Sequence, residues 1–314
     1  MTTASATFRA ATLPAEDAAP ARGPRREALR RLLRHRMAAA SLVVLLAIGT
    51  LAALGSRVPA VQRYDPRYDQ DYDAVQQGPS VDHFFGTDNL GRDTWSRVLH
   101  GTLTSLTVGL GVQAIVLVLG LAAGSLAVLG GRWWDHVVMR LTDLAYAFPD
   151  LLAIILLSNV FRGRDLSLLG NEASHVALVI AAIAFVNWVT VARLVRGQLL
   201  SLREEEFVVA ARALGASEAR IVFRHLLPHA MGPVIVTLVF GVPLAIFAEA
   251  ALSFLGLGLP PPSPSLGSLI DEGNEFAATN AWMLVFPAGM VALLMLCFTF
   301  LGDGLRDALD PRSR

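Results

Sequence analysis

The stretch "FVVAARALGASEARIVFRHLLP" (Phe207–Pro228) is charged and amphipathic, although it lies between two strongly apolar parts of the chain. Gly215 has the position of a residue that ends a helix in the left-handed conformation. Ser217 can cap a second helix, whose first turn contains Glu218. The stretch therefore predicts two short helices joined at Gly215. They form either an amphipathic connection on the membrane or a rigid docking element for a soluble partner.

The limits of these two helices follow from their flanking residues. Ser201 and Glu204 have the spacing of a capping box, which predicts that the first helix begins at Leu202. Pro228 is expected to end the second helix, because proline interrupts a helix. The apolar face of the first helix would consist of Phe207, Val208, Ala211 and Leu214.

The composition indicates a membrane protein. Of 314 residues, 54% are hydrophobic and only 17% are charged, whereas about a quarter of the residues of a soluble domain are charged. All 26 basic residues are arginine, so the chain has no P-loop lysine and is not expected to be an ATP-hydrolysing enzyme itself. The net charge of zero predicts no nucleic-acid partner. Cys297 is the single cysteine, which excludes an internal disulfide and a cysteine-rich metal site.

Six windows are apolar enough to cross a membrane, which takes roughly 20 residues each. The windows are Met37–Gly55, Leu103–Leu129, Val137–Val160, Val176–Ala192, Gly232–Leu257 and Ala281–Leu301. We expect an all-α membrane protein with six transmembrane helices, although the third and fourth windows could be buried soluble helices. The third carries Arg140 and Asp143, which are spaced to pair on one helical face. Gly120 and Gly124 predict close helix packing in the second window.

Arginine placement predicts the orientation. Six spans put 19 arginines on one side and seven on the other, so both termini are expected in the cytoplasm. The predicted segments are a cytoplasmic tail 1–36, an anchor 37–55, a periplasmic loop 56–102, a core 103–302 with a cytoplasmic loop 193–229, and a tail 303–314. The alternative of a cleaved signal peptide is disfavoured, since the first window is long and far from the N-terminus.

Within the tail 1–36, residues 1–24 are rich in alanine, proline and threonine and are expected to be disordered. The segment Arg25–Arg36 predicts a basic helix at the anionic leaflet, where it also sets the topology.

Polar residues within the spans are candidates for a translocation pathway. Glu249 is an ionisable group inside the fifth window, where charge is costly. It has either a structural partner or a place in a water-filled pathway. Asn187, in the fourth window, is the second candidate pathway residue.

No metal site is expected. The loop Tyr64–Asp73 has alternating aspartates, but Ala74 and Ser80 occupy positions where a calcium-binding loop needs glycine and glutamate. His225 and His229 have metal-ligand spacing, but Pro228 lies between them. We also find no nucleophile triad or carboxylate pair, so no catalytic residue is assigned.

The motif "AARALG…LLP" resembles the EAA loop of ABC importer permeases. The matching residues are Ala210, Ala211, Gly215, Leu227 and Pro228. Val209 stands in place of the motif glutamate and His225 in place of an isoleucine. Glu206 or Glu205 could supply the missing carboxylate from the same helix. The predicted coupling residues are thus Glu206 and the five matching positions.

Four longer stretches resemble the C-type permease subunit of dipeptide, oligopeptide and nickel importers. They are "FFGTDNLGRDTWSRVLHG", "LVRGQLLSLREEEFVVAARALGAS", "AEAALSFLGLG" and "LGDGLRDALDPR". The resemblance covers the chain from about Phe84 to Pro311 and implies a type I importer permease in the inner membrane of a bacterium. Its implied partners are a second homologous permease, two P-loop ATPases that bind ATP and magnesium, an extracytoplasmic binding protein and the lipid membrane.

In this family Arg203–Pro228 would insert into a groove on one ATPase, and the permease itself holds no cofactor. Dipeptides or oligopeptides are the commonest cargo, and nickel, glutathione and other small solutes are the alternatives. A secondary transporter is a different possibility, but it would favour several carboxylates within the spans and inverted repeats. We find neither in this chain.

Overall fold

The computed structural model describes residues 24–55, 58, 61–161 and 171–310. Within these ranges the regular structure is helical apart from one isolated bridge between Thr87 and Asp93, and residues 61–93 are mostly turns and irregular chain. The α-helices, in chain order, are α1 (Pro24–Arg34), α2 (Arg36–Gly55), α3 (Thr94–Leu129), α4 (Gly131–Tyr146), α5 (Asp150–Phe161), α6 (Asn171–Leu202), α7 (Glu206–Ala213), α8 (Glu218–Ile221), α9 (Leu227–Phe254), α10 (Leu266–Glu275) and α11 (Trp282–Leu309). The predicted disordered tail lies outside the described residues except for its last position.

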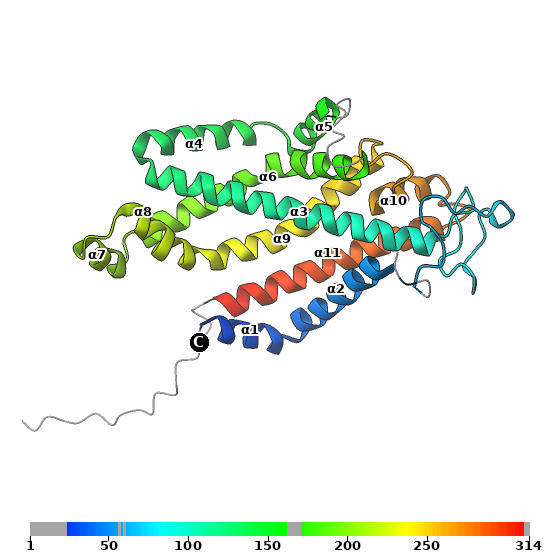
Figure 1. The fold of residues 1–314 in the computed structure, drawn as a ribbon, viewed down its shortest axis with the longest axis horizontal. Helices are drawn as coiled ribbons and strands as arrows, with labels where there is room; N and C mark the ends of the chain where they lie inside the picture. The colour runs from blue at the N-terminus through cyan, green and yellow to red at the C-terminus, as the bar shows by residue number, and fades with distance from the viewer. Residues whose placement is uncertain (1–23, 56–57, 59–60, 162–170, 311–314) are drawn as a thin grey trace, which may run out of the picture.

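Five long helical segments run along the bundle (Figure 1) and are apolar enough to cross a membrane: α2, α3, most of α6, the continuous stretch from α8 to α9, and α11. They confirm five of the six predicted windows. Most of the helices extend beyond their windows at polar ends, whereas α9 ends at Phe254, before its window does. For example, α3 begins at Thr94, where the Asp93 side chain accepts a hydrogen bond from the Ser96 N–H. The predicted loop 56–102 therefore includes the first turns of α3.

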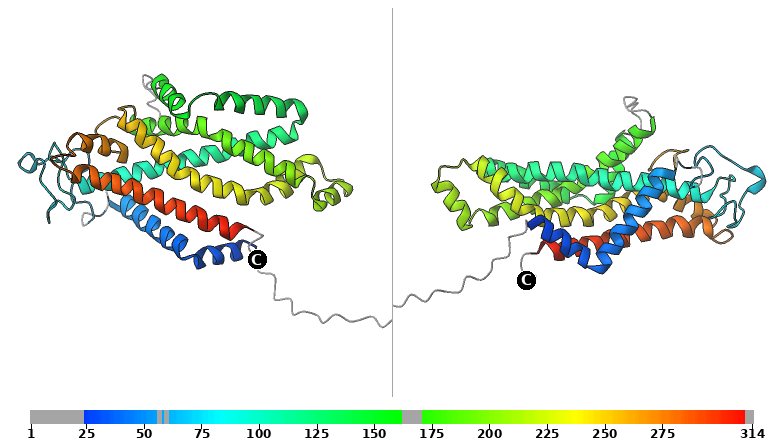
Figure 2. Two further views of the ribbon diagram at one scale, coloured as in Figure 1. Left: turned by 180° about the vertical axis from the view of Figure 1, so that it is seen from behind. Right: turned by 60° about the horizontal axis from the view of Figure 1, so that its bottom comes forward.

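The third window, Val137–Val160, is not one straight helix. It is divided between α4 and α5, which are bent by 93° at a short break. Pro149 lies in that break, and proline disfavours helical geometry in the residue before it. α5 projects from the side of the bundle (Figure 2). The chain has a sixth candidate span only if the bent pair is counted as one.

Two ion pairs fasten α4 to α6. Arg193 donates to Asp143 at 2.8 Å, and Arg196 donates to Asp135 at 2.7 Å. The predicted pairing of Asp143 with Arg140 is therefore wrong, because the carboxylate turns to a neighbouring helix rather than along its own.

The packing of α3 against α6 depends on the small residues that the sequence predicted. A Cβ added to Gly120 would lie 2.5 Å from Val191, and one added to Gly124 would lie 2.7 Å from Val195. No side chain fits at either glycine without a shift of the facing helix. The predicted role of this pair in close helix packing is thus confirmed.

The two ends of the bundle differ. α7 and α8 project at one end, with α1 and the last turns of α11 towards the same side, whereas α10 and residues 61–93 cover the other end (Figure 1). At the covered end the Arg97 guanidinium donates to Asp88 at 2.6 Å and to Glu272 at 2.6 and 3.0 Å. Arg92 joins the same two carboxylates at 2.7 and 3.0 Å. This cluster fixes α10 to the start of α3.

Candidate coupling site

The first helix of the motif begins later than its sequence predicts. α6 continues through Leu202, and α7 starts at Glu206 after a turn. Ser201 cannot cap a new helix, because it still lies in the last turn of α6, where the Arg203 N–H bonds to the Leu199 carbonyl at 3.1 Å. Glu205 occupies the N-cap position and makes no side-chain capping bond. The capping-box prediction is therefore wrong.

The turn after α7 has the predicted form. Gly215 has φ +82°, its N–H bonds to the Arg212 carbonyl at 2.9 Å, and the Ala216 N–H bonds to the Ala211 carbonyl at 3.1 Å. These two bonds form a Schellman motif. No atom outside the neighbouring residues lies within 4 Å of a Cβ added at Gly215. Only the backbone conformation therefore requires glycine here.

The second helix does not end at Pro228. Ser217 caps it as predicted, by accepting from the Arg220 N–H. The chain then passes through one π-helical segment, Val222–Leu226, in which the Leu227 N–H bonds to the Val222 carbonyl. Pro228 follows in the first turn of α9, where a missing N–H is tolerated. α8 thus runs directly into the span α9, so a displacement of α8 reaches the membrane without a flexible joint.

The coupling segment, residues 203–228, packs against the bundle through its buried residues. Val208 and Ile221 are fully buried and Leu226 is 1% exposed. All three belong to the hydrophobic cluster that also contains buried residues of α3, α6 and α9, and Ala211 and Leu227 pack against that cluster. The segment is therefore part of the folded core rather than a loose loop.

The segment exposes large apolar side chains among charged ones. Leu214 is 89% exposed, Phe223 60% and Val209 58%. Leu214, predicted on the apolar face of the first helix, is the C-cap of α7 and projects from the segment, whereas Val208 of the same predicted face is buried. Sequence reasoning did not predict Leu214 and Phe223 as surface residues. The position of Leu214 directly before the helix-ending Gly215 could have predicted that its side chain leaves the helical face.

Ion pairs with Glu218 join α8 to α7 and to the turn before α7. Glu218 accepts from Arg212 at 2.8 and 3.2 Å and from Arg203 at 3.3 Å. The hydrogen bond to Glu218 raises the pKa of Arg212 above its usual value. Glu206 is exposed, and within the described part of the chain no ion pair involves it. It lies three residues before Val209, so both face the same side of α7.

The remaining predicted coupling residues lie on the same segment. Ala210 and Pro228 are exposed, whereas Ala211 and Leu227 are half-buried. Together with Gly215 and Glu206, they place the six predicted positions on α7, the turn after it and the start of α9.

The two candidate pathway residues lie within the bundle. Glu249 is fully buried on α9, where it accepts from the Ser105 hydroxyl of α3 at 3.0 Å and from the Ser253 hydroxyl at 2.8 Å. The Ser265 hydroxyl, next to α10, donates to Ser253 at 3.2 Å. This geometry supplies the structural partners that were one of the two alternatives for Glu249. Asn187 is half-buried and donates to the Ile183 carbonyl of its own helix at 2.8 Å. A role of either residue in a pathway stays a prediction.

Comparisons with known proteins agree with this architecture. Residues 94–314 match the family model described as "Binding-protein-dependent transport system inner membrane component". Residues 23–79 match the "N-terminal TM domain of oligopeptide transport permease C".

Three curated relatives match most of their own length. The chain is 37% identical to the oligopeptide transport system permease protein OppC of Bacillus subtilis (strain 168), over 92% of this chain and 90% of the relative. It is 36% identical to the dipeptide transport system permease protein DppC of Alkalihalophilus pseudofirmus, over 96% and 94%. It is also 37% identical to the glutathione transport system permease protein GsiD of Pectobacterium atrosepticum, over 97% and 96%.

Two solved structures share the fold. Both are of the MetNI methionine ABC transporter in inward-facing conformations, with TM-scores of 0.52 and 0.54. Each match is 18% identical and covers 68% of this chain and 96% of the solved chain. These matches confirm the predicted importer permease fold for the greater part of the chain.

Proposed function

Because the chain belongs to the family of binding-protein-dependent transport system inner membrane components, we propose that it forms half of the membrane pathway of an ATP-driven peptide importer. It is a permease subunit of an ABC transporter and lies in the inner membrane. Peptides are the proposed cargo, because two of the relatives are named for oligopeptide and dipeptide transport.

The observation that carries the proposal is the coupling segment, residues 203–228. It projects from one end of the bundle (Figure 1) and has an exposed apolar surface at Val209, Leu214 and Phe223. Exposed large apolar side chains on an element whose other side is buried in the core are the kind of surface that a protein partner covers. We assign this surface to a cytoplasmic ATPase. Because α1 and the last turns of α11 lie towards the same end of the bundle (Figure 1), this assignment supports the proposal that both termini are cytoplasmic, as the arginine distribution predicts.

The proposed assembly contains a second, homologous permease, two P-loop ATPases and an extracytoplasmic binding protein. ATP and magnesium bind to the ATPases, since this chain has no lysine for a P-loop. The family and its relatives support the presence of ATPase and binding-protein partners. The number of each subunit is part of the proposal.

Coupling follows from the continuity of the helices. When the ATPases close on ATP, the docked segment moves with them. The fixed Schellman turn at Gly215 and the buried contacts of Val208 and Ile221 prevent the segment from bending independently. The π-helical segment then transmits the displacement to α9 as a rigid-body movement. In this mechanism the chain does mechanical work and no covalent chemistry.

Uptake by proteoliposomes tests the proposal. The vesicles contain this chain, the partner permease and the ATPases, with ATP inside and the binding protein and a labelled dipeptide outside. We expect uptake that is lost when the ATPases are omitted or ATP is replaced by ADP. Uptake by this chain alone in an ion gradient would overturn the proposal. Labelled glutathione is the second cargo to compare, because one relative is named for it.

A further inference from the structure

The helix α1 is fastened to the end of α11. Leu32 is 7% exposed and belongs to the hydrophobic cluster that contains Ala38 and Ala308. At the junction with α2, the Nδ1 atom of His35 accepts from the Ala38 N–H at 3.3 Å. The His35 Nε2 atom lies 3.9 Å from the Asp307 carboxylate of α11. α1 therefore has a fixed position beside the bundle (Figure 2).

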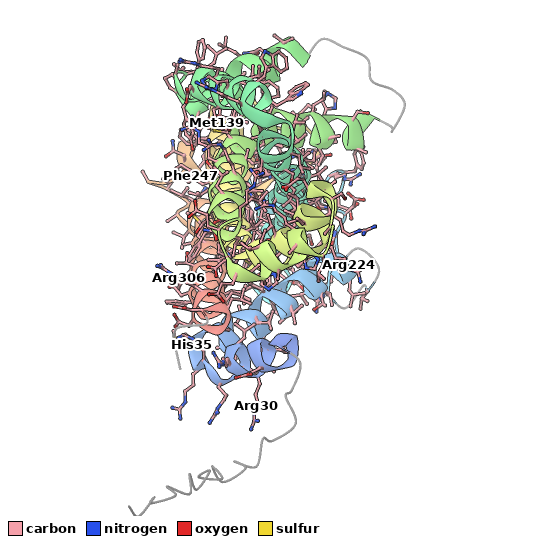
Figure 3. The ribbon with its side chains drawn as sticks, turned by 90° about the vertical axis from the view of Figure 1, so that its left-hand side faces the viewer. Arg30, His35, Met139, Arg224, Phe247 and Arg306 are labelled. Carbon is pink, nitrogen blue, oxygen red and sulfur yellow. The ribbon has the colours of Figure 1, made fainter. Side chains whose placement is uncertain are left out.

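A second face of α1 is apolar and uncovered. Leu29 and Leu33 are one helical turn apart and each is 54% exposed. Arg30 and Arg34 follow them in sequence and are also exposed. Arg30 points away from the bundle, near His35 (Figure 3). The arginines thus border a pair of exposed leucines.

The charge and the place of α1 identify what covers this face. The segment Pro24–Arg36 has six arginines and one acidic residue, Glu27. Glu27 pairs with Arg31 at 2.6 Å, whereas Arg30 and Arg34 are exposed and give this side of α1 a positive surface. The membrane span α2 begins at Arg36, which puts α1 at the boundary between hydrocarbon and water. A basic, amphipathic helix at that depth fits an anionic lipid surface.

We propose that α1 lies in the surface of the bilayer. Leu29 and Leu33 enter the boundary of the acyl chains, while Arg30 and Arg34 bind the phosphates of anionic lipids. Long arginine side chains can place their charge in the headgroup region while their stems remain near apolar groups. The lipid surface thereby fixes the end of α11 through Leu32. This inference requires only that α2 spans the membrane, and it does not depend on the identity of the cargo.

The single cysteine makes a direct test possible. Cys297 is changed to serine in the full chain, and a nitroxide is attached in turn to Leu33→Cys and Arg34→Cys. The proteins are inserted into vesicles of phosphatidylcholine mixed with phosphatidylglycerol. Collisions of each label with oxygen, which concentrates in lipid, and with a water-soluble nickel chelate are then measured.

We expect the label at position 33 to favour oxygen and the label at position 34 to favour the nickel chelate. Equal access of nickel to both labels would show a solvated helix and overturn the proposal. Shielding of position 33 from both reagents would also overturn it, since protein rather than lipid would then cover this face. ATP-driven uptake is measured separately, so the two proposals can fail independently.

A second arm tests the role of charge. With the label at Leu33→Cys, the double change Arg30→Gln and Arg34→Gln should lower the ratio of immersed to exposed label in anionic vesicles by about fivefold per arginine. Vesicles of phosphatidylcholine alone should show little difference between the variants. Arg63→Gln, in the segment that covers the opposite end of the bundle (Figure 1), is the matched control. An unchanged ratio in correctly inserted protein would refute binding of anionic lipid by these arginines.

Discussion

Arg97, in the first turn of α3, donates to both carboxylate oxygens of Glu272 on α10, at 2.6 and 3.0 Å, although 175 residues separate them. The same guanidinium donates to Asp88 at 2.6 Å. Arg97 is 2% exposed, so water does not replace these contacts when they are lost. The covering of this end of the bundle therefore depends on two buried arginines, Arg97 and Arg92, which share the same two carboxylates.

Replacing Arg97 by methionine should destabilise the protein strongly. The change removes one of the two arginines that pair with Asp88 and Glu272. Breaking a buried pair costs up to about 3–5 kcal/mol, and the remaining pairs with Arg92 should keep the loss towards the lower end of that range. Thermal unfolding of the purified protein in detergent measures the loss. Arg63→Met is the matched control, because Arg63 is exposed and its loss should cost less than about 1 kcal/mol. Equal melting temperatures for both variants would contradict the importance of the cluster.

Gly215→Val should uncouple the ATPases from the membrane spans. The φ of +82° is unfavourable for a β-branched residue, so the turn must change its shape. We expect lower substrate-stimulated ATPase activity in the assembled complex, with the membrane spans still folded.

Gly289→Val is the matched control for that change. Gly289 lies in α11 with no positive φ and with no atom within 4 Å of an added Cβ, so this variant should retain its ATPase activity. Normal coupling in Gly215→Val would argue against a rigid turn.

Leu214→Asp should weaken docking without unfolding the chain. This side chain is 89% exposed, so a charge there leaves the core intact. If Leu214 contacts the ATPase, its affinity should fall by about tenfold, the equivalent of ~1.4 kcal/mol. Co-purification of the ATPases at a series of concentrations measures the effect. Val81→Asp introduces the same charge at a residue that is 80% exposed near the other end, and it should leave the affinity unchanged.

Substitutions of Glu249 should distinguish packing from transport. Glu249→Gln keeps a side chain that can bond to Ser105 and Ser253, and we expect a loss of roughly 1 kcal/mol with transport largely retained. Glu249→Leu leaves both hydroxyls without their acceptor and should reduce the yield of folded protein more severely. If Glu249→Gln assembled normally but abolished transport, a role in the pathway would replace the structural one.

The spans were predictable because hydropathy is a local property. Five apolar windows became helices, and Gly215 and Ser217 took their predicted positions because turn and cap geometry depend on near neighbours. Errors arose where a long helix overrode a local signal. α6 continued past Ser201, and a π-helical segment allowed α8 to continue past Pro228.

Contacts between distant segments could not be predicted from local patterns. Glu249 was recognised as a buried charge, but its partner Ser105 comes from α3. Ser265, which donates to the second partner Ser253, lies next to α10. The pairing of Arg97 with Glu272 likewise joins two segments that are far apart in the sequence. The exposure of Leu214 depends on the residue at which α7 ends, which helical periodicity alone does not give.

The claim that residues 203–228 dock on an ATPase is tested most directly by photo-cross-linking from position 214. A photoreactive phenylalanine analogue replaces Leu214 in the complete complex, and the same analogue at Val81 serves as the control. We predict that the label at position 214 cross-links to an ATPase subunit, whereas the label at position 81 does not. A complex that hydrolyses ATP normally but gives no ATPase cross-link from position 214 would contradict the account.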